Sequence, residues 1–210
     1  MKKIAALILL AALSTHAGAK VKPVAHYNFG KAGNVSFAVA PETVTPQKGT
    51  GTLTFVGRPL FYADAPADKA AKGEGCILFG GKEDGYRGNQ ALGDAKSNMI
   101  LEVWVKAREA EGHKGVVVAN GSGRAGYTIA QADKQWVLVS GGAMVAVIGE
   151  VAKGKWTHLA AVLEDGKGSV WMDGKRTKTF NPTKELAPNF SIAASDELKD
   201  FFHGEVYEVR

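Results

Sequence analysis

Paired carboxylates are the side chains with the clearest chemical potential in this sequence. In retaining glycosidases, two carboxyl groups about 5 Å apart cleave the glycosidic bond. The nearest approach to such a pair is Glu205-Val206-Tyr207-Glu208, because Glu102 has no carboxylate two residues away. Side chains alternate along a strand, so Glu205 and Glu208 are expected to point to opposite faces. The spacing therefore argues against a retaining glycosidase site.

Other catalytic arrangements are missing from the sequence. It contains no G-x-S-x-G or H-E-x-x-H motif and no cysteine and histidine arrangement typical of a nucleophile. Cys76 is the only cysteine and precedes an apolar run at 77–79. Its thiol is therefore predicted to be buried and inert. These observations favour a protein that binds over one that catalyses.

The segment Gly121-Ser122-Gly123-Arg124 superficially resembles a phosphate-binding loop. Such loops depend on the N-terminus of a following helix, and the residues that follow here have the pattern of a strand. The segment is therefore predicted to be a hairpin loop at the rim of the fold. There Asn120 and Arg124 could donate hydrogen bonds to a ligand.

Two tryptophans are expected to share a strand face with polar groups. Alternation places Glu102, Trp104 and Lys106 on one face of their strand and aliphatic residues on the other. Trp171 has the same arrangement, with Ser169 and Asp173 beside it. An indole covers the C–H surface of a sugar while polar groups take its hydroxyls. Two interpretations stay open: a ligand platform, or partly covered packing residues.

The segment 155–164 is largely apolar on both faces. Such a pattern is typical of a central strand that is covered on both sides. Trp156 is therefore predicted to be a core residue. His158 is predicted to be a hydrogen-bonded core histidine rather than a ligand or a base.

An all-β architecture is needed to position these residues. Short runs of β-branched and aromatic residues recur between Gly, Asp and Asn turn signals, and hardly any window has helical periodicity. Strands are predicted at 24–29, 35–40, 52–56, 76–79, 99–107, 115–119, 126–131, 135–140, 144–150, 155–164, 168–173, 189–193 and 203–210. This number of strands suits two packed sheets.

Turn signals add local detail. Asp165-Gly166 and Asp173-Gly174 supply the positive φ angles of tight hairpins and predict a three-stranded meander. Residues 63–75 are small, polar and interrupted by Pro66, which predicts a mobile loop inside a single domain.

The first nineteen residues have the order of a secretory signal peptide. Lys2 and Lys3 precede an apolar run at 4–13, and Ala17-Gly18-Ala19 provides a cleavage site. The run is about half as long as a bilayer span requires. Cleavage would leave residues 20–210 as one secreted or periplasmic domain. No cysteine follows the cleavage site to accept a lipid.

Composition excludes some classes of partner. Without Lys2 and Lys3, the 26 basic residues fall to 24 against 21 acidic ones, a net charge of +3 that is scattered along the chain. This balance does not indicate nucleic acid or a membrane as partner. A single cysteine cannot form an internal disulfide, so stability must come from a sizeable apolar core.

Four segments form a recognisable series along the chain. They are MILEVWVK at 99–106, GKWTH at 154–158 with the apolar run that follows it, VWMDGK at 170–175, and the closing segment 202–210. In this order they resemble the laminin-G-like branch of the concanavalin A-like lectin/glucanase superfamily. The segment Tyr27-x-Phe29 resembles the family's opening strand. The resemblance covers about residues 77–210. It implies an antiparallel jelly-roll sandwich whose curved sheet and rim loops bind glycans or proteins, often beside Ca²⁺.

This chain departs from the family around that ion. Gly30, Gly80 and Tyr207 stand where the family commonly has aspartate. Calcium takes six to eight oxygen ligands, carboxylates among them, so a family-type site is not expected. Glu83 and Asp84 are the remaining candidate ligands from one loop.

The sequence thus predicts an exported, non-catalytic module that recognises an extracellular glycan or a surface protein. The predicted ligand-binding residues are Glu102, Trp104, Lys106, Trp171, Asn120 and Arg124. The sequence ends within the closing strand, so it is expected to be either a fragment or an unusually blunt protein. If it is a fragment, the resemblance implies a C-terminal catalytic domain outside this sequence, because such modules commonly stand at the N-terminus of secreted hydrolases. The alternatives are a lyase or hydrolase with its active site on the concave sheet, and a structural spacer without a ligand.

Overall fold

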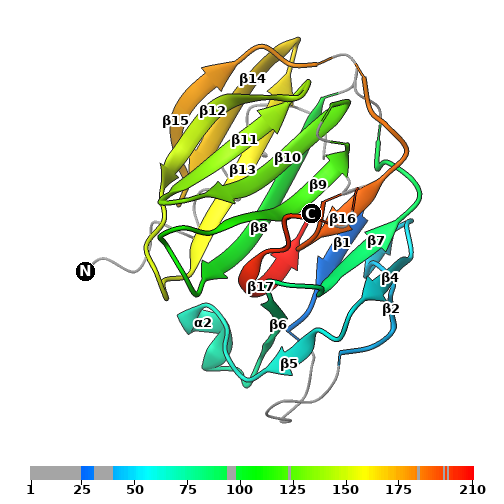
Figure 1. Cartoon of the computed structure of the whole chain (residues 1–210), viewed down its shortest axis with the longest axis vertical. Helices are drawn as coiled ribbons and strands as arrows, with labels where there is room; N and C mark the ends of the chain where they lie inside the picture. Colours follow the sequence, from blue (N-terminus) through cyan, green and yellow to red (C-terminus); the bar gives the residue numbers. More distant parts are fainter. Residues whose placement is uncertain are drawn as a thin grey trace.

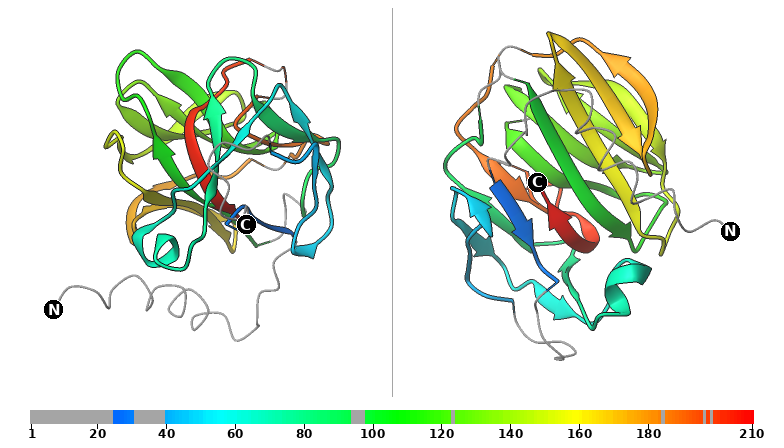
Figure 2. Two further views of the ribbon diagram at one scale, coloured as in Figure 1. Left: turned by 90° about the horizontal axis from the view of Figure 1, so that it is seen from below. Right: turned by 180° about the vertical axis from the view of Figure 1, so that it is seen from behind.

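The computed structural model describes residues 25–30, 40–93, 98–122, 124–183, 185–195, 197 and 199–210. These residues form two antiparallel sheets that stack as a sandwich (Figures 1 and 2). The predicted fold class is therefore confirmed. The predicted signal peptide and residues 35–39 of the strand predicted at 35–40 lie outside the described residues.

Sheet 1 forms the rear layer in Figure 1. Its path runs through β15 (Lys175–Phe180), β14 (Lys167–Met172), β13 (Thr157–Glu164), β8 (Met99–Ala107), β17 (His203–Val209), β1 (Ala25–Asn28) and β3 (Lys48–Gly49). Strand β6 (Cys76–Gly80) also pairs with β17, and β5 (Leu60–Tyr62) pairs with β6. The last strand of the chain is therefore paired along both of its edges.

Sheet 2 forms the front layer. Its order is β12 (Ala143–Glu150), β11 (Gln135–Ser140), β10 (Gly126–Ala132), β9 (Lys114–Gly121), β16 (Phe190–Ile192), β7 (Gly85–Gly88), β4 (Leu53–Val56) and β2 (Thr43–Val44). The short helix α2 (Ala67–Ala70) lies within the segment that was predicted as a loop. No helix in the described ranges has the length and apolarity to cross a membrane.

The core lies between the sheets and is built by alternation. On β8, Leu101, Val103 and Val105 are buried, while the residues between them are only partly covered. On β11, Trp136 and Leu138 are fully buried and belong to the same apolar cluster. Burial of aliphatic and aromatic side chains from both sheets is the main force that holds the sandwich together.

The predicted three-stranded meander is confirmed by β13, β14 and β15. Asp165 and Gly166 have φ angles of 50° and 74°, and Asp173 and Gly174 have 47° and 80°. Two successive positive φ angles make the tight turns whose twist matches that of the flanking strands. The two hairpins therefore fix the register of these strands.

The other predicted strands that the structure describes agree with it to within two residues at each end. Strands β2, β3, β5 and β7 were not predicted. They have only two to four residues each, which is too short for an alternating pattern to be visible.

Candidate functional site

Four of the predicted site residues lie on one surface, the outer face of sheet 1, which points away from sheet 2. Glu102, Trp104 and Lys106 alternate with the buried residues of β8, as predicted. Trp171 lies on the same face, because its register partner on β13 is Ala160, which in turn pairs with Glu102 on β8. The right-hand view of Figure 2 looks onto this face.

A chain of ion pairs crosses the middle of the face. Glu102 Oε2 lies 3.2 Å from His158 Nε2, and its Oε1 lies 3.1 Å from Arg210 Nη1. Arg210 Nη2 lies 2.9 Å from Glu208 Oε1, which is 2.5 Å from His26 Nε2. Each carboxylate thus contacts two basic groups, so the side chains hold one another in fixed positions.

The charge state of Glu102 follows from these contacts. Burial alone raises its pKa, but the hydrogen bond and charge of His158 and those of Arg210 outweigh burial and bring the pKa below its usual range. Glu102 is therefore ionised at neutral pH. It can accept hydrogen bonds from hydroxyl groups, but it is poorly suited to donate a proton.

Two indoles lie on this face. The ring of Trp104 lies against that of His158 with centroids 5.1 Å apart. The ring of Trp171 is held by a hydrogen bond of 3.0 Å from its Nε1 to Ser169 Oγ. Between the two strands that carry the indoles, β13 contributes His158, which lies opposite Trp104, and Ala160, which is 1% exposed. Ala160 is therefore covered by the larger side chains around it.

The segment between β5 and β6 covers the end of the face where Lys106 lies. The Lys106 ammonium contacts Asp64 and lies 3.5 Å from Glu205 Oε1. It also lies 5.3 Å from the centre of the Trp156 ring. Its side chain is 12% exposed. Lys106 therefore joins the covering segment to the sheet rather than presenting its charge to solvent.

Cys76 belongs to this covered end. It is free and fully buried, as predicted, and burial raises the pKa of its thiol.

Trp156 and His158 were predicted to be core residues, and both are largely or partly covered, but on the outer side of sheet 1 and not between the sheets. Trp156 precedes β13 and packs edge-on against Tyr207 on the outer side of sheet 1, with its Nε1 donating to Asp64 Oδ1 at 3.4 Å. His158 is hydrogen-bonded and only 12% exposed, but it also lies on the outer face. The apparent second core face of β13 consists of small residues that larger neighbouring side chains cover.

The prediction for the closing carboxylates was wrong. In the register between β17 and β8, Glu205 lies opposite Lys106 and Glu208 lies opposite Trp104. A register shift lies between Val206 and Glu208. The extra residue of this β-bulge brings both carboxylates to the outer face. Glu205 is nevertheless 1% exposed and lies 2.9 Å from Arg108. It is too deeply buried to meet a substrate.

Asn120 and Arg124 lie on the other sheet and do not join the outer face of sheet 1. Asn120 is 2% exposed, and its amide exchanges hydrogen bonds of 2.8 and 2.7 Å with the backbone of Leu92. Its predicted role as a donor to a ligand is therefore not supported, because its hydrogen-bonding groups are already in use. Arg124 is exposed in the hairpin between β9 and β10.

The residues around the family's calcium position do not fit such an ion. Both carboxylate oxygens of Asp84 accept backbone N–H groups, from Arg58 and Gly80, at 2.9 Å each. A Cβ atom at Gly30 would lie 2.6 Å from Glu74 and 2.7 Å from Tyr207, so an aspartate there would clash. The described residues contain no group of three or more His, Cys, Asp or Glu that could hold a metal.

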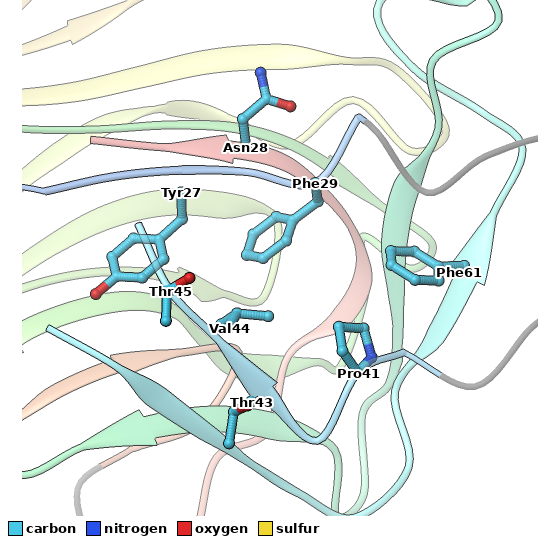
Figure 3. A pocket seen from close by; sticks show the side chains of 8 residues that line it. All are labelled: Tyr27, Asn28, Phe29, Pro41, Thr43, Val44, Thr45 and Phe61. Atoms are coloured by element: carbon cyan, nitrogen blue, oxygen red, sulfur yellow. The ribbon is translucent and has the colours of Figure 1, made fainter. Parts of the chain in front are cut away.

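A separate pocket of about 250 Å³ opens near the ends of β1, β2 and β5 (Figure 3). It is lined by Tyr27, Asn28, Phe29, Pro41, Thr43, Val44, Thr45 and Phe61. None of the predicted site residues lines it, so it is distinct from the outer face of sheet 1.

The sequence of the chain matches one family model. Residues 80–210 match Laminin_G_3, which is described as the concanavalin A-like lectin/glucanases superfamily. No curated protein sequence matches the chain.

Several solved structures share the fold. Domain 4 of an extracellular GH43 arabinanase from Geobacillus stearothermophilus, in complex with arabinotriose, matches with a TM-score of 0.65 and 16% identity over 91% of this chain and 92% of that one. Trypanosoma rangeli sialidase matches with a TM-score of 0.58 and 13% identity over 97% of this chain but 35% of its own. The receptor-binding domain of a botulinum neurotoxin C/D mosaic serotype matches with a TM-score of 0.56 and 10% identity, over 88% of this chain and 47% of that one.

Proposed function

The chain belongs to the concanavalin A-like lectin/glucanases superfamily, and from this premise we propose that it is an exported recognition module that binds an extracellular glycan. One arrangement carries the proposal. Trp171 and Trp104 lie on the outer face of sheet 1, beside the fixed charges of Glu102 and Arg210.

The chemistry of these side chains suits a sugar ring. An indole offers a flat apolar surface to the C–H groups of a sugar, and adjacent polar groups take its hydroxyls. The carboxylate of Glu102 accepts hydrogen bonds, while the guanidinium of Arg210, 27% exposed, donates them. Because the ion pairs already hold these side chains in place, binding costs little conformational entropy.

The arabinanase domain adds support from outside the chain. It has the same fold over nearly its whole length and was solved with arabinotriose. A domain of this shape can therefore bind an oligosaccharide. A surface protein as the ligand, which the sequence also allowed, has no comparable support.

The rival function, cleavage of a glycan, draws on the β-bulge that brings Glu205 and Glu208 to one face. Glycosidases need one carboxyl group with a raised pKa to act as the proton donor. Glu102 has a lowered pKa, and Glu205 is buried. These properties favour binding. Release of reducing sugar from a bound glycan by the purified chain would reverse this preference.

The proposal also covers export of the chain and the bounds of its domain. Residues 1–19 have the pattern of a signal peptide, so we expect residues 20–210 to act as one secreted or periplasmic module, joined in some settings to a catalytic domain. Mass spectrometry of the exported protein should find Lys20 as its first residue. An exported protein that keeps Met1 would contradict this expectation.

A glycan array probed with residues 20–210, with and without calcium, tests the proposed ligand class. Loss of the indole in Trp171→Ala should weaken binding of the best glycan about tenfold or more. The matched control is Met144→Ala, because Met144 is 54% exposed and belongs to sheet 2. Equal effects of the two substitutions, or no glycan bound at all, would contradict the proposal.

A further inference from the structure

Strand β15 places one basic side chain next to Trp171, the indole proposed to stack on a sugar. Residues 175–179 of this strand are all exposed. A register shift at Val170 and Trp171 pairs Arg176 with Trp171 and Lys178 with Val170. Val170 is a core residue, so Lys178 belongs to the inward-facing side of the strand. Arg176 therefore shares the outer face of sheet 1 with Trp171.

Arg176 differs from the other basic groups of this face in its partners. Arg210 is paired with Glu102 and Glu208. Lys106 contacts Asp64 and Glu205. No ion pair joins Arg176 to any carboxylate in the described part of the chain, and its side chain is exposed. Its guanidinium therefore has hydrogen-bond donors free for a ligand.

Resting on the proposed function, we propose that Trp171 and Arg176 form a subsite for a carboxylate-bearing sugar, such as a uronic acid unit of an acidic glycan. Directly paired residues on neighbouring strands have Cβ atoms about 5 Å apart. The carboxylate of a uronic acid is attached directly to the sugar ring, so a ring stacked on Trp171 brings it within reach of Arg176. A guanidinium binds a carboxylate through two parallel hydrogen bonds.

The neighbouring residues fit this assignment. Ser169 holds the indole of Trp171 through its hydroxyl, and the register partner of Ser169 is Thr179 on β15. Thr179 is exposed and offers a further hydroxyl on the same face. Basic side chains on an edge strand also discourage pairing with other chains, which accounts for Lys175 and Lys178. That role does not require an arginine beside the indole.

The test compares matched ligands on the exported chain by titration calorimetry. The probes are oligogalacturonate and oligomannuronate, each alongside its carboxyl-reduced neutral form. The wild-type chain should bind at least one acidic form about tenfold more tightly than its neutral counterpart, the value expected for one charge-assisted pair. Arg176→Gln should remove this difference and change binding of the neutral form less than about twofold.

Lys178→Gln is the control, because it removes the same charge from the same strand on the other side. It should leave the preference for the acidic form within about twofold of wild type. Equal losses in the two variants would mean diffuse attraction and would overturn the subsite. If the wild-type chain binds the acidic and neutral forms equally tightly, the carboxylate subsite is overturned. In that case, weaker binding of the neutral form by Trp171→Ala would still support the proposed function. Binding of no probe and of no array glycan would overturn both.

Discussion

The outer faces of the two sheets differ sharply, although both sheets have the same kind of inner face. The solvent side of sheet 1 carries indoles and a chain of paired charges. The solvent-side positions of the central strands of sheet 2 include Ala119, Thr128, Ala130, Val137 and Ser191, and none of these five is more than 9% exposed. Inward-facing positions thus specify the sandwich, whereas outward-facing positions distinguish the proposed ligand surface on sheet 1 from the outer face of sheet 2.

The tryptophans show the same contrast and give the prediction with the largest effect. Trp136 points inward from sheet 2 and is fully buried, whereas Trp171 is partly exposed on sheet 1. Trp136→Ala should lower the free energy of unfolding by about 3–5 kcal/mol, the range for deleting a buried aromatic side chain. Trp171→Ala should cost clearly less. Urea denaturation of both variants measures the difference, and similar losses would mean that the outer indole is ordinary packing.

Buried charge on sheet 1 gives the next prediction. Glu205 is 1% exposed and lies close to Lys106 and Arg108. Glu205→Gln should destabilise the fold by about 3 kcal/mol, because it leaves partly buried cations without their counter-charge. The control is Glu197→Gln at an exposed pair with Lys199, which should not measurably change the melting temperature. A Glu205 variant as stable as this control would show that the covered end of the face does not depend on its ion pairs.

Acid should weaken the polar face of sheet 1 through Glu102. Its pKa in the folded chain lies below the reference value of 4.5 because of His158 and Arg210, despite the opposing effect of burial. A lowered pKa stabilises the fold above the unfolded-state value, and this contribution is lost as the pH falls through the folded-state value. The stability advantage of wild type over Glu102→Gln should therefore shrink below about pH 4.5. Melting temperatures between pH 2 and pH 7 test this, and a constant difference would contradict it.

Chelation should have the smallest effect of all. The oxygens of Asp84 are bonded to backbone N–H groups, and Gly30 has no room for a carboxylate. EDTA should therefore leave the melting temperature unchanged, whereas removal of a saturating ion from the native state would lower it visibly. A clear fall with EDTA, reversed by added Ca²⁺, would show that ion binding contributes to the stability of this sandwich.

Much of the fold could be predicted from the sequence because β8, β11 and β14 alternate regularly and because Asp-Gly pairs mark the hairpins. The same alternation placed Glu102, Trp104, Lys106 and Trp171 on one face. Alternation predicted opposite faces for Glu205 and Glu208, which was wrong, because the β-bulge inserts one residue and the sequence around it gives no sign of the insertion. It also failed at Trp156, whose surroundings come from the distant segment around Asp64.

Tertiary contacts between segments far apart in the sequence decide how open the face is. Lys106 looks like a free cation beside Trp104 in the sequence, but Asp64 and Glu205 neutralise it in the fold. Arg176 was not predicted as a site residue, because its pairing with Trp171 depends on the register shift in β14 and β15.

The position of β17 has a consequence for the order of folding. Sheet 1 needs residues 203–209 between β8 on one edge and β6 and β1 on the other. The hairpins from β9 to β12 join neighbouring segments and can form early, whereas β1, which pairs with β3 on one edge, gains its partner on the other edge only about 180 residues later. The nascent chain therefore cannot complete its sandwich until β17 has been synthesised. Under the proposed export, this delay would favour the unfolded state that translocation requires.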